Sequence, residues 1–231
     1  DSDGNTVGGS NAGDSITSAT DCTFFGKDAG TDITTGQFNT FIGSKAGSNT
    51  ANTTYLNTFV GYQAGSNNGN SANHNVFIGA DAGLHNSAWD NVFIGNYTGD
   101  ANTSGTKNVF VGKNAGTANT SGSYNTFVGF EAGKSVTDDP ECTFVGYQSG
   151  YSNIVSKSTA YGYSSLYSNT NGEDNTALGH RAMYGNTTGD NNTAVGRSAL
   201  NQNTTGNDNT AVGEAAGYNN TGSDNTLSLI H

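Results

Sequence analysis

The stretch Asn39-Thr40-Phe41-Ile42-Gly43-Ser44-Lys45-Ala46-Gly47 returns along the whole chain with small changes. The next copy reads Asn57-Thr58-Phe59-Val60-Gly61-Tyr62-Gln63-Ala64-Gly65, and a late copy reads Asn192-Thr193-Ala194-Val195-Gly196-Arg197-Ser198-Ala199-Leu200. Positions within a copy are numbered from this first residue. Complete copies begin at residues 5, 22, 39, 57, 75, 91, 108, 125, 142, 158, 175, 192 and 209, and a truncated copy begins at 225. A tandem repeat of 16–18 residues therefore occupies residues 5–226 as a single segment.

The length of the copy selects the fold class. Helical repeats need about 33 or more residues per copy, whereas 16–18 residues suit one coil with two short strands and two turns. Position 5 is Gly in every complete copy, from Gly9 to Gly213, as expected where the backbone bends or leaves the region open to other residues. The sequence predicts an all-β fold, a parallel β-solenoid (β-roll) of about thirteen coils.

Two adjacent apolar positions form the predicted core of the repeat. Neighbouring residues of a strand face opposite sides, so we expect position 3 inside the coil and position 4 in a contact with another copy of the chain. The core residues at position 3 are Phe24, Phe41, Phe59, Phe77, Phe93, Phe110, Phe127 and Phe144. Those at position 4 are Val60, Ile78, Ile94, Val111, Val128, Val145, Val195 and Val212.

Position 9 changes together with position 3. Copies with Phe at position 3 have Gly at position 9, whereas three of the four copies with Ala at position 3 carry Leu166, Met183 or Leu200 there. Volume lost at one position returns at the other, as close packing requires. We therefore expect positions 3 and 9 to share one space inside the coil.

Position 1 is Asn in most copies, with Cys22, Cys142 and Ser158 as exceptions. Asn side chains stacked in register can hydrogen-bond from one coil to the next as a ladder. The predicted ladder contains Asn39, Asn57, Asn75, Asn91, Asn108, Asn125, Asn175, Asn192 and Asn209. Cys22 and Cys142 lie seven copies apart, so we expect no disulfide between them, because bridged Cα atoms lie within about 7 Å.

The composition excludes several classes of protein. Hydrophobic residues make up 32% of the chain and charged residues 12%, but the 11 Phe and 11 Tyr recur regularly, which is not typical of disorder. Eight scattered Lys and Arg residues do not form the basic stripe of a nucleic-acid-binding protein. No run approaches the ~20 apolar residues of a membrane span. The chain starts at Asp1 without a Met, and Leu227–His231 departs from the repeat, so we expect a fragment of a longer chain whose last residues are foreign to it.

No constellation of residues indicates an enzyme, a cofactor site or a metal site. The four His residues have no constant place in the copy, whereas catalytic and zinc sites need convergent ligands. Acidic residues stand just before position 1 in several copies, and we interpret them as Asx-type turn caps rather than as a calcium ladder; they are Asp21, Asp90, Asp174, Asp208 and Asp224.

Two groups of surface residues leave alternatives open. Asn-x-Ser/Thr triplets at Asn52, Asn102, Asn119, Asn186 and Asn203 are either glycosylation sites or chance products of the composition. Aromatic residues at positions 6 and 7 can either stack on the sugars of a receptor glycan or be ordinary surface residues; they are Tyr62, Tyr97, Phe130, Tyr147 and Tyr163.

The pattern Asn-Thr-Ala-Val-Gly-x-x-Ala, as in Asn192–Ala199, resembles the head repeats of YadA-like trimeric autotransporter adhesins, and similar units occur in phage-type tail-fibre proteins. The resemblance covers residues 5–226. It implies a left-handed parallel β-roll wound as a homotrimer and exposed at the surface of a cell or virion. Its partners would be other copies of the chain and a surface glycan or host receptor.

Three functions therefore come into question. The first is an extracellular structural and adhesive fibre segment that presents a rigid, repetitive surface for attachment. The second is the subunit of a self-assembling extracellular filament, because uncapped solenoid ends expose strand edges. The third is ice binding, which ranks last because position 4 is apolar where a flat Thr array would carry Thr.

Overall fold

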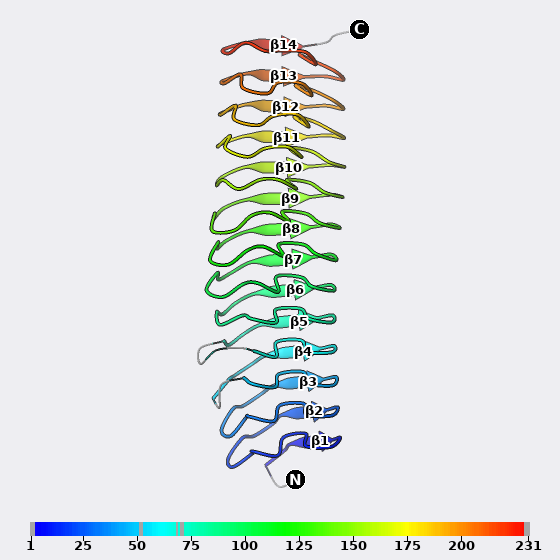
Figure 1. The fold of residues 1–231 in the computed structure, drawn as a ribbon, viewed down its shortest axis with the longest axis vertical. Helices are drawn as coiled ribbons and strands as arrows, with labels where there is room; N and C mark the ends of the chain where they lie inside the picture. The colour runs from blue at the N-terminus through cyan, green and yellow to red at the C-terminus, as the bar shows by residue number, and fades with distance from the viewer. Residues whose placement is uncertain (1–2, 51–52, 68, 70–71, 229–231) are drawn as a thin grey trace. The chain divides into compact units, whose positions relative to one another are not determined.

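Each copy of the repeat forms one coil of a parallel β-solenoid (Figure 1). The computed structural model describes residues 3–50, 53–67, 69 and 72–228, and these contain no helix. The chain divides into two compact units, residues 1–121 and 122–231. The predicted fold class is confirmed: all strands are parallel, and coils of 16–18 residues follow one another through both units.

The strands are three residues long and contain positions 2, 3 and 4 of each copy. The first unit holds β1 (Thr6–Gly8), β2 (Thr23–Phe25), β3 (Thr40–Ile42), β4 (Thr58–Val60), β5 (Val76–Ile78), β6 (Val92–Ile94) and β7 (Val109–Val111). The second unit holds β8 (Thr126–Val128), β9 (Thr143–Val145), β10 (Thr159–Tyr161), β11 (Thr176–Leu178), β12 (Thr193–Val195), β13 (Thr210–Val212) and β14 (Thr226–Ser228). Within each unit, equal positions of successive coils lie opposite one another, as Thr40 lies opposite Thr58.

The expectation of two strands per coil was wrong. The described part of each coil contains one strand, and the return leg consists of bends and turns, apart from isolated bridges such as that between Thr20 and Gln37. The return leg is rich in Gly, Asn, Ser and Thr, which favour turns over a regular strand ladder.

Gly at position 5 ends each strand for two physical reasons. Gly26 has a φ of 138°, in a region that is essentially restricted to Gly. A Cβ on Gly26 would also lie 2.5 Å from the carbonyl oxygen of Gly43 in the next coil. The invariant Gly therefore permits both the turn of the backbone and the close contact between coils.

The interior of the Phe-containing coils is a column of stacked rings. In the first unit, Phe41 and Phe59 have ring centroids 4.7 Å apart at an angle of 5°, and the other stacked pairs from Phe24 to Phe110 are 4.8–5.2 Å apart. In the second unit, Phe127 and Phe144 stack at 5.3 Å. All eight Phe side chains at position 3 are fully buried.

The predicted sharing of space between positions 3 and 9 is confirmed. A Cβ on Gly30, at position 9, would lie 2.8 Å from the ring of Phe24. In coils with Ala at position 3, Leu166, Met183 and Leu200 at position 9 are fully buried instead. The interior is thus filled either by a ring from the strand or by an aliphatic side chain from the turn.

Candidate interaction surfaces

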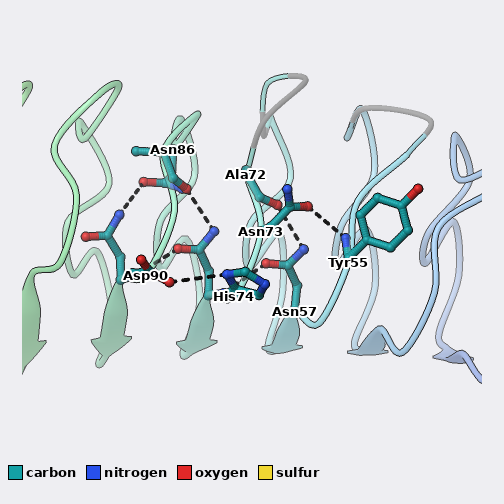
Figure 2. Close-up of polar contacts among 10 residues, drawn as sticks. Tyr55, Asn57, Ala72, Asn73, His74, Asn86 and Asp90 are labelled. Carbon is teal, nitrogen blue, oxygen red and sulfur yellow. Dashed lines mark hydrogen bonds and ion pairs between the residues drawn. The ribbon is translucent and has the colours of Figure 1, made fainter.

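The Asn side chains of position 1 link each coil to the following one. The Oδ1 atom of Asn57 accepts a hydrogen bond from the backbone N–H of Asn75 at 2.9 Å, and its Nδ2 donates to the carbonyl of Ala72 at 2.9 Å. Figure 2 shows the second of these bonds within a network of polar contacts between coils. Each carboxamide therefore satisfies one donor and one acceptor of the neighbouring backbone where the regular ladder ends.

The same pair of bonds recurs in both units. The side chains that accept from the next position-1 N–H and donate to the carbonyl three residues before it belong to Asn5, Asn39, Asn57, Asn75, Asn91, Asn125, Asn175, Asn192 and Asn209. Asn108 donates its backbone N–H to Asn91. All nine side chains of the predicted ladder are buried.

The cysteines reproduce half of this arrangement. The Cys142 Sγ donates to the carbonyl of Val155 at 3.3 Å, in the place where an Asn would donate its Nδ2–H. Both thiols are free and buried. Burial raises the pKa of the Cys142 thiol to about 12 and raises the pKa of Cys22 as well. A thiol that stays protonated in the folded chain is a donor here and a poor nucleophile.

A second ladder of Asn side chains, at position 12, escaped the sequence analysis. Asn102 Nδ2 donates to the carbonyl of Gly105 at 2.9 Å within its own coil, and Asn119 Nδ2 donates to Asn102 Oδ1 at 2.7 Å. Equivalent bonds join Asn169 to Asn153 and Asn186 to Asn169 in the second unit. The signal was present in the alignment of the copies, because position 12 is Asn in most of them.

This second ladder decides between the two interpretations of the Asn-x-Ser/Thr triplets. Asn102, Asn119, Asn186 and Asn203 belong to position 12 and are fully buried. Their carboxamides are held by hydrogen bonds within a coil or to the neighbouring coil, so the folded chain does not present them for glycosylation. Asn52 lies outside the described residues.

Position 4 of the predicted repeat core faces away from the coil interior, as expected for residues in a contact with another copy of the chain, and that contact itself stays a prediction. Val60, Ile94, Val111, Val128, Val145 and Val195 are half-buried, and Ile78 and Val212 are exposed. The physical reason is the alternation of a strand: once position 3 points into the coil, position 4 points outward. These side chains, together with Thr or Val at position 2, form the outer strand face, which carries two columns of residues in each unit.

Residues just before position 1 adopt a left-handed backbone. Asp90 has a φ of 60°, and Phe38 and Leu56 have the same sign of φ at the same place in their copies. Asp tolerates this conformation well, but the site requires the backbone rather than a side-chain cap, since bulky apolar residues also occupy it. Asp90 pairs with His74 of the preceding coil at 3.3 Å (Figure 2).

The surface aromatics fall into two groups. In the second unit, Phe130, Tyr147, Tyr163 and His180 stack in one column with centroids 5.0–5.3 Å apart. Both ring faces of Tyr147 and Tyr163 are therefore packed against neighbours, which leaves no free face for a sugar.

A second aromatic column runs beside the first at position 10. Tyr151, Tyr167 and Tyr184 stack at 4.9 and 5.1 Å. The Nζ of Lys134 lies 5.2 Å from the ring centroid of Tyr151, and the guanidinium of Arg181 lies 5.3 Å from that of Tyr184. Hydrogen bonding to Glu131 raises the pKa of Lys134, so this cation stays protonated. The rings and cations of this column contact one another, which indicates a structural role in the turn.

Neither a metal site nor a membrane span emerges from the part of the chain that the structure describes. Within it, no group of three or more His, Cys, Asp and Glu side chains is placed to hold a metal ion. The same residues include no helix that is long and apolar enough to cross a membrane. No protein-family model matches the chain, and a search of curated proteins returns no match.

Proposed function

We propose that this chain is a non-enzymatic structural and adhesive segment of an extracellular fibre, in which copies of the chain pack together through the outer strand face. The observation that carries the proposal is the exposure of that face. Phe25 is 60% exposed, and Ile42 and Ile78 are 38% exposed each. A contiguous apolar surface of this kind marks a site of protein contact.

The rim of the same face strengthens the argument in the first unit. Phe38 and Leu56, just before position 1 of their copies, are 53% exposed each. They lie two residues before β3 and β4 in the chain, so exposed apolar side chains occur next to these strands as well as on them. Asp21, Asp90 and Lys107 also lie just before position 1, but strand positions 2 and 4 carry no charged residue in any complete copy, so burial of these two columns against a second copy would cost little desolvation of charge.

A second copy fits this surface better than an unrelated partner. Successive coils repeat at the spacing of neighbouring strands, about 4.8 Å, so each copy offers the same periodic columns of side chains. Two or three copies can interlock these columns with one register. The homotrimeric state, the left-handed winding and the location on a cell or virion surface, all implied by the resemblance to YadA-like head repeats, belong to this proposal.

The bonds between coils supply the rigidity that a fibre needs. Within each unit, successive coils are tied together by strand pairing and, in most coils, by a buried Asn carboxamide. Nothing in this pattern depends on a catalytic or cofactor group. Attachment then rests on surfaces that repeat from coil to coil.

Light scattering of the purified chain over a range of concentrations tests the proposal. We expect a defined oligomer, with a trimer favoured, and dissociation in the variant Ile42→Lys/Ile78→Lys. The matched control is Ala80→Lys at position 6, where Lys27 and Lys113 occur naturally. A folded wild-type monomer at all concentrations would contradict the proposal, whereas particles that grow without limit would indicate the filament instead.

A further inference from the structure

The first unit carries a groove on the turn that follows the strands. Its volume is about 460 Å³. It is lined by the buried residues Ser48 and Ser66 at position 10 and by Lys45 and Gln63 at position 7. Asn49 and Asn67, at position 11, line it as well. Equal positions of successive coils form the groove, so it runs along the direction in which the coils stack.

The groups in the groove are held in place by bonds between coils. Ser48 Oγ and Ser66 Oγ are 3.4 Å apart, and Asn49 Nδ2 donates to Asn67 Oδ1 at 3.3 Å. The backbone N–H of Asn49 donates to Asp32 Oδ2 at 2.7 Å. Preorganised polar groups of this kind bind a ligand without a large loss of side-chain entropy.

The chemistry of the lining selects the class of ligand. Hydroxyls and carboxamides both donate and accept hydrogen bonds, which matches the hydroxyl groups of a sugar. One carboxylate, that of Asp28, and one ammonium, that of Lys45, line the groove, so the charges balance. An anionic ligand would require several Arg or Lys residues, and a metal ion would require several oxygen ligands of negative charge.

We propose that this groove binds a neutral, linear oligosaccharide that lies along the stacked coils. The inference rests on the proposed role in attachment and names the ligand of that role. Three successive coils line the groove through Asp28, Lys45 and Gln63, and at about 4.8 Å per coil they span the length of two to three sugar residues. The volume lies within the range of ligand pockets, about 300–1,000 Å³.

The second unit shows how the same place is closed. There, position 10 carries Tyr151, Tyr167 and Tyr184 instead of Ser, and the three rings stack on one another. The backbone of the coil therefore accepts Tyr at position 10. This difference supplies a variant that fills the groove with side chains that the fold already tolerates.

The experiment compares the wild-type chain with Ser48→Tyr/Ser66→Tyr. Binding is measured by saturation-transfer difference NMR with neutral tetrasaccharides of glucose, mannose and N-acetylglucosamine and with tetragalacturonic acid as the anionic probe. We expect at least one neutral probe to bind at millimolar concentration or below, and the variant to weaken it at least tenfold. Tyr167→Ser, in the other unit, serves as the control and should retain the binding.

A second variant guards against misfolding. Gln63→Ala/Asn67→Ala removes two lining carboxamides without adding volume, and it should weaken the same probe while circular dichroism stays unchanged. The inference is overturned if no neutral probe binds, if only the anionic probe binds, or if neither groove variant changes the affinity. Light scattering reports separately on the fibre proposal, because none of these substitutions lies on the outer strand face.

Discussion

Coils with Phe at position 3 and coils with Ala at position 3 fill the same interior space, the first with a side chain of the strand and the second with a side chain of the turn. In the Phe coils, a ring from the strand covers a Gly in the turn, as Phe77 covers Gly83. In three of the four Ala coils, a fully buried Leu or Met at position 9 in the turn accompanies the small strand residue, as Leu200 accompanies Ala194. The comparison shows that the repeat conserves the volume of the interior rather than the residue that supplies it.

The Ala solution has a backbone cost. Leu166, Met183 and Leu200 have φ values of 52°, 49° and 48°, where residues other than Gly are strained by roughly 1–2 kcal/mol each. Full burial of such a side chain contributes about 1.5–3 kcal/mol, which offsets the strain. Phe with Gly avoids the strain and adds ring stacking to the interior.

The largest effect is expected when the Phe ring is removed from the interior of one coil and the Ala–Leu pairing of the other coils is then introduced. Phe77→Ala should lower the free energy of unfolding by about 3–5 kcal/mol, because it leaves a cavity in the column of rings. Adding Gly83→Leu should restore a large part of the loss, since it recreates the pairing of Ala194 with Leu200. Urea denaturation followed by circular dichroism measures both. A double variant no more stable than Phe77→Ala would show that the two positions do not share one space.

The Asn ladder allows a second comparison of Phe coils with Ala coils, because the ladder occurs in both. Asn57→Ala and Asn192→Ala each remove the partners of one buried N–H and one buried carbonyl, and each should cost about 2–4 kcal/mol. Equal losses are expected, although Asn57 lies in a Phe coil and Asn192 in an Ala coil. Asn192→Cys keeps the donor, as Cys142 does, and should cost less than Asn192→Ala in the same denaturation series. If the losses of unfolding free energy differ between the two coils by more than the error, the contribution of the Asn ladder depends on the residue that fills the interior.

Cys142 is the first residue of the last Phe coil and gives a pH-dependent test. Its folded pKa of about 12 lies above the ordinary value of 9.0, so the unfolded chain loses the proton first as the pH rises. The contribution of the thiol to stability is complete below pH 9 and is lost between pH 9 and pH 12, by about 1.4 kcal/mol for each unit of pH. Denaturation of wild type and Cys142→Asn across this range should show a steeper fall for wild type. Parallel curves would contradict the buried, protonated thiol.

The smallest loss of stability is expected in the second aromatic column, at position 10. Tyr167→Ser removes ring contacts with Tyr151 and Tyr184, and it should cost about 0.5–1.5 kcal/mol, well below the loss in Phe77→Ala. Thermal unfolding measures the difference, and Arg197→Ala, in an exposed ion pair with Glu214, is a control expected to stay within about 1 kcal/mol of wild type. An equal loss of stability in Tyr167→Ser and Phe77→Ala would mean that the second aromatic column contributes as much to stability as the interior.

The sequence by itself determined the coil, its register and its interior. Gly at position 5, the exchange between positions 3 and 9 and the buried Asn at position 1 all follow from local backbone geometry and from residues that recur at one spacing. In a tandem repeat each coil contacts mainly its neighbours. The periodicity of the sequence therefore already indicates which residues of neighbouring coils contact one another.

Only the tertiary structure decided where the side chains outside this interior lie. It turned position 12 into a second ladder, packed both ring faces of Tyr147 and Tyr163 against neighbouring rings and formed a polar groove at Ser48. These outcomes depend on the path of the return leg, which has no regular strand. Its conformation is set by left-handed residues and by side-chain hydrogen bonds between coils, and neither leaves a periodic hydrophobic pattern in the sequence.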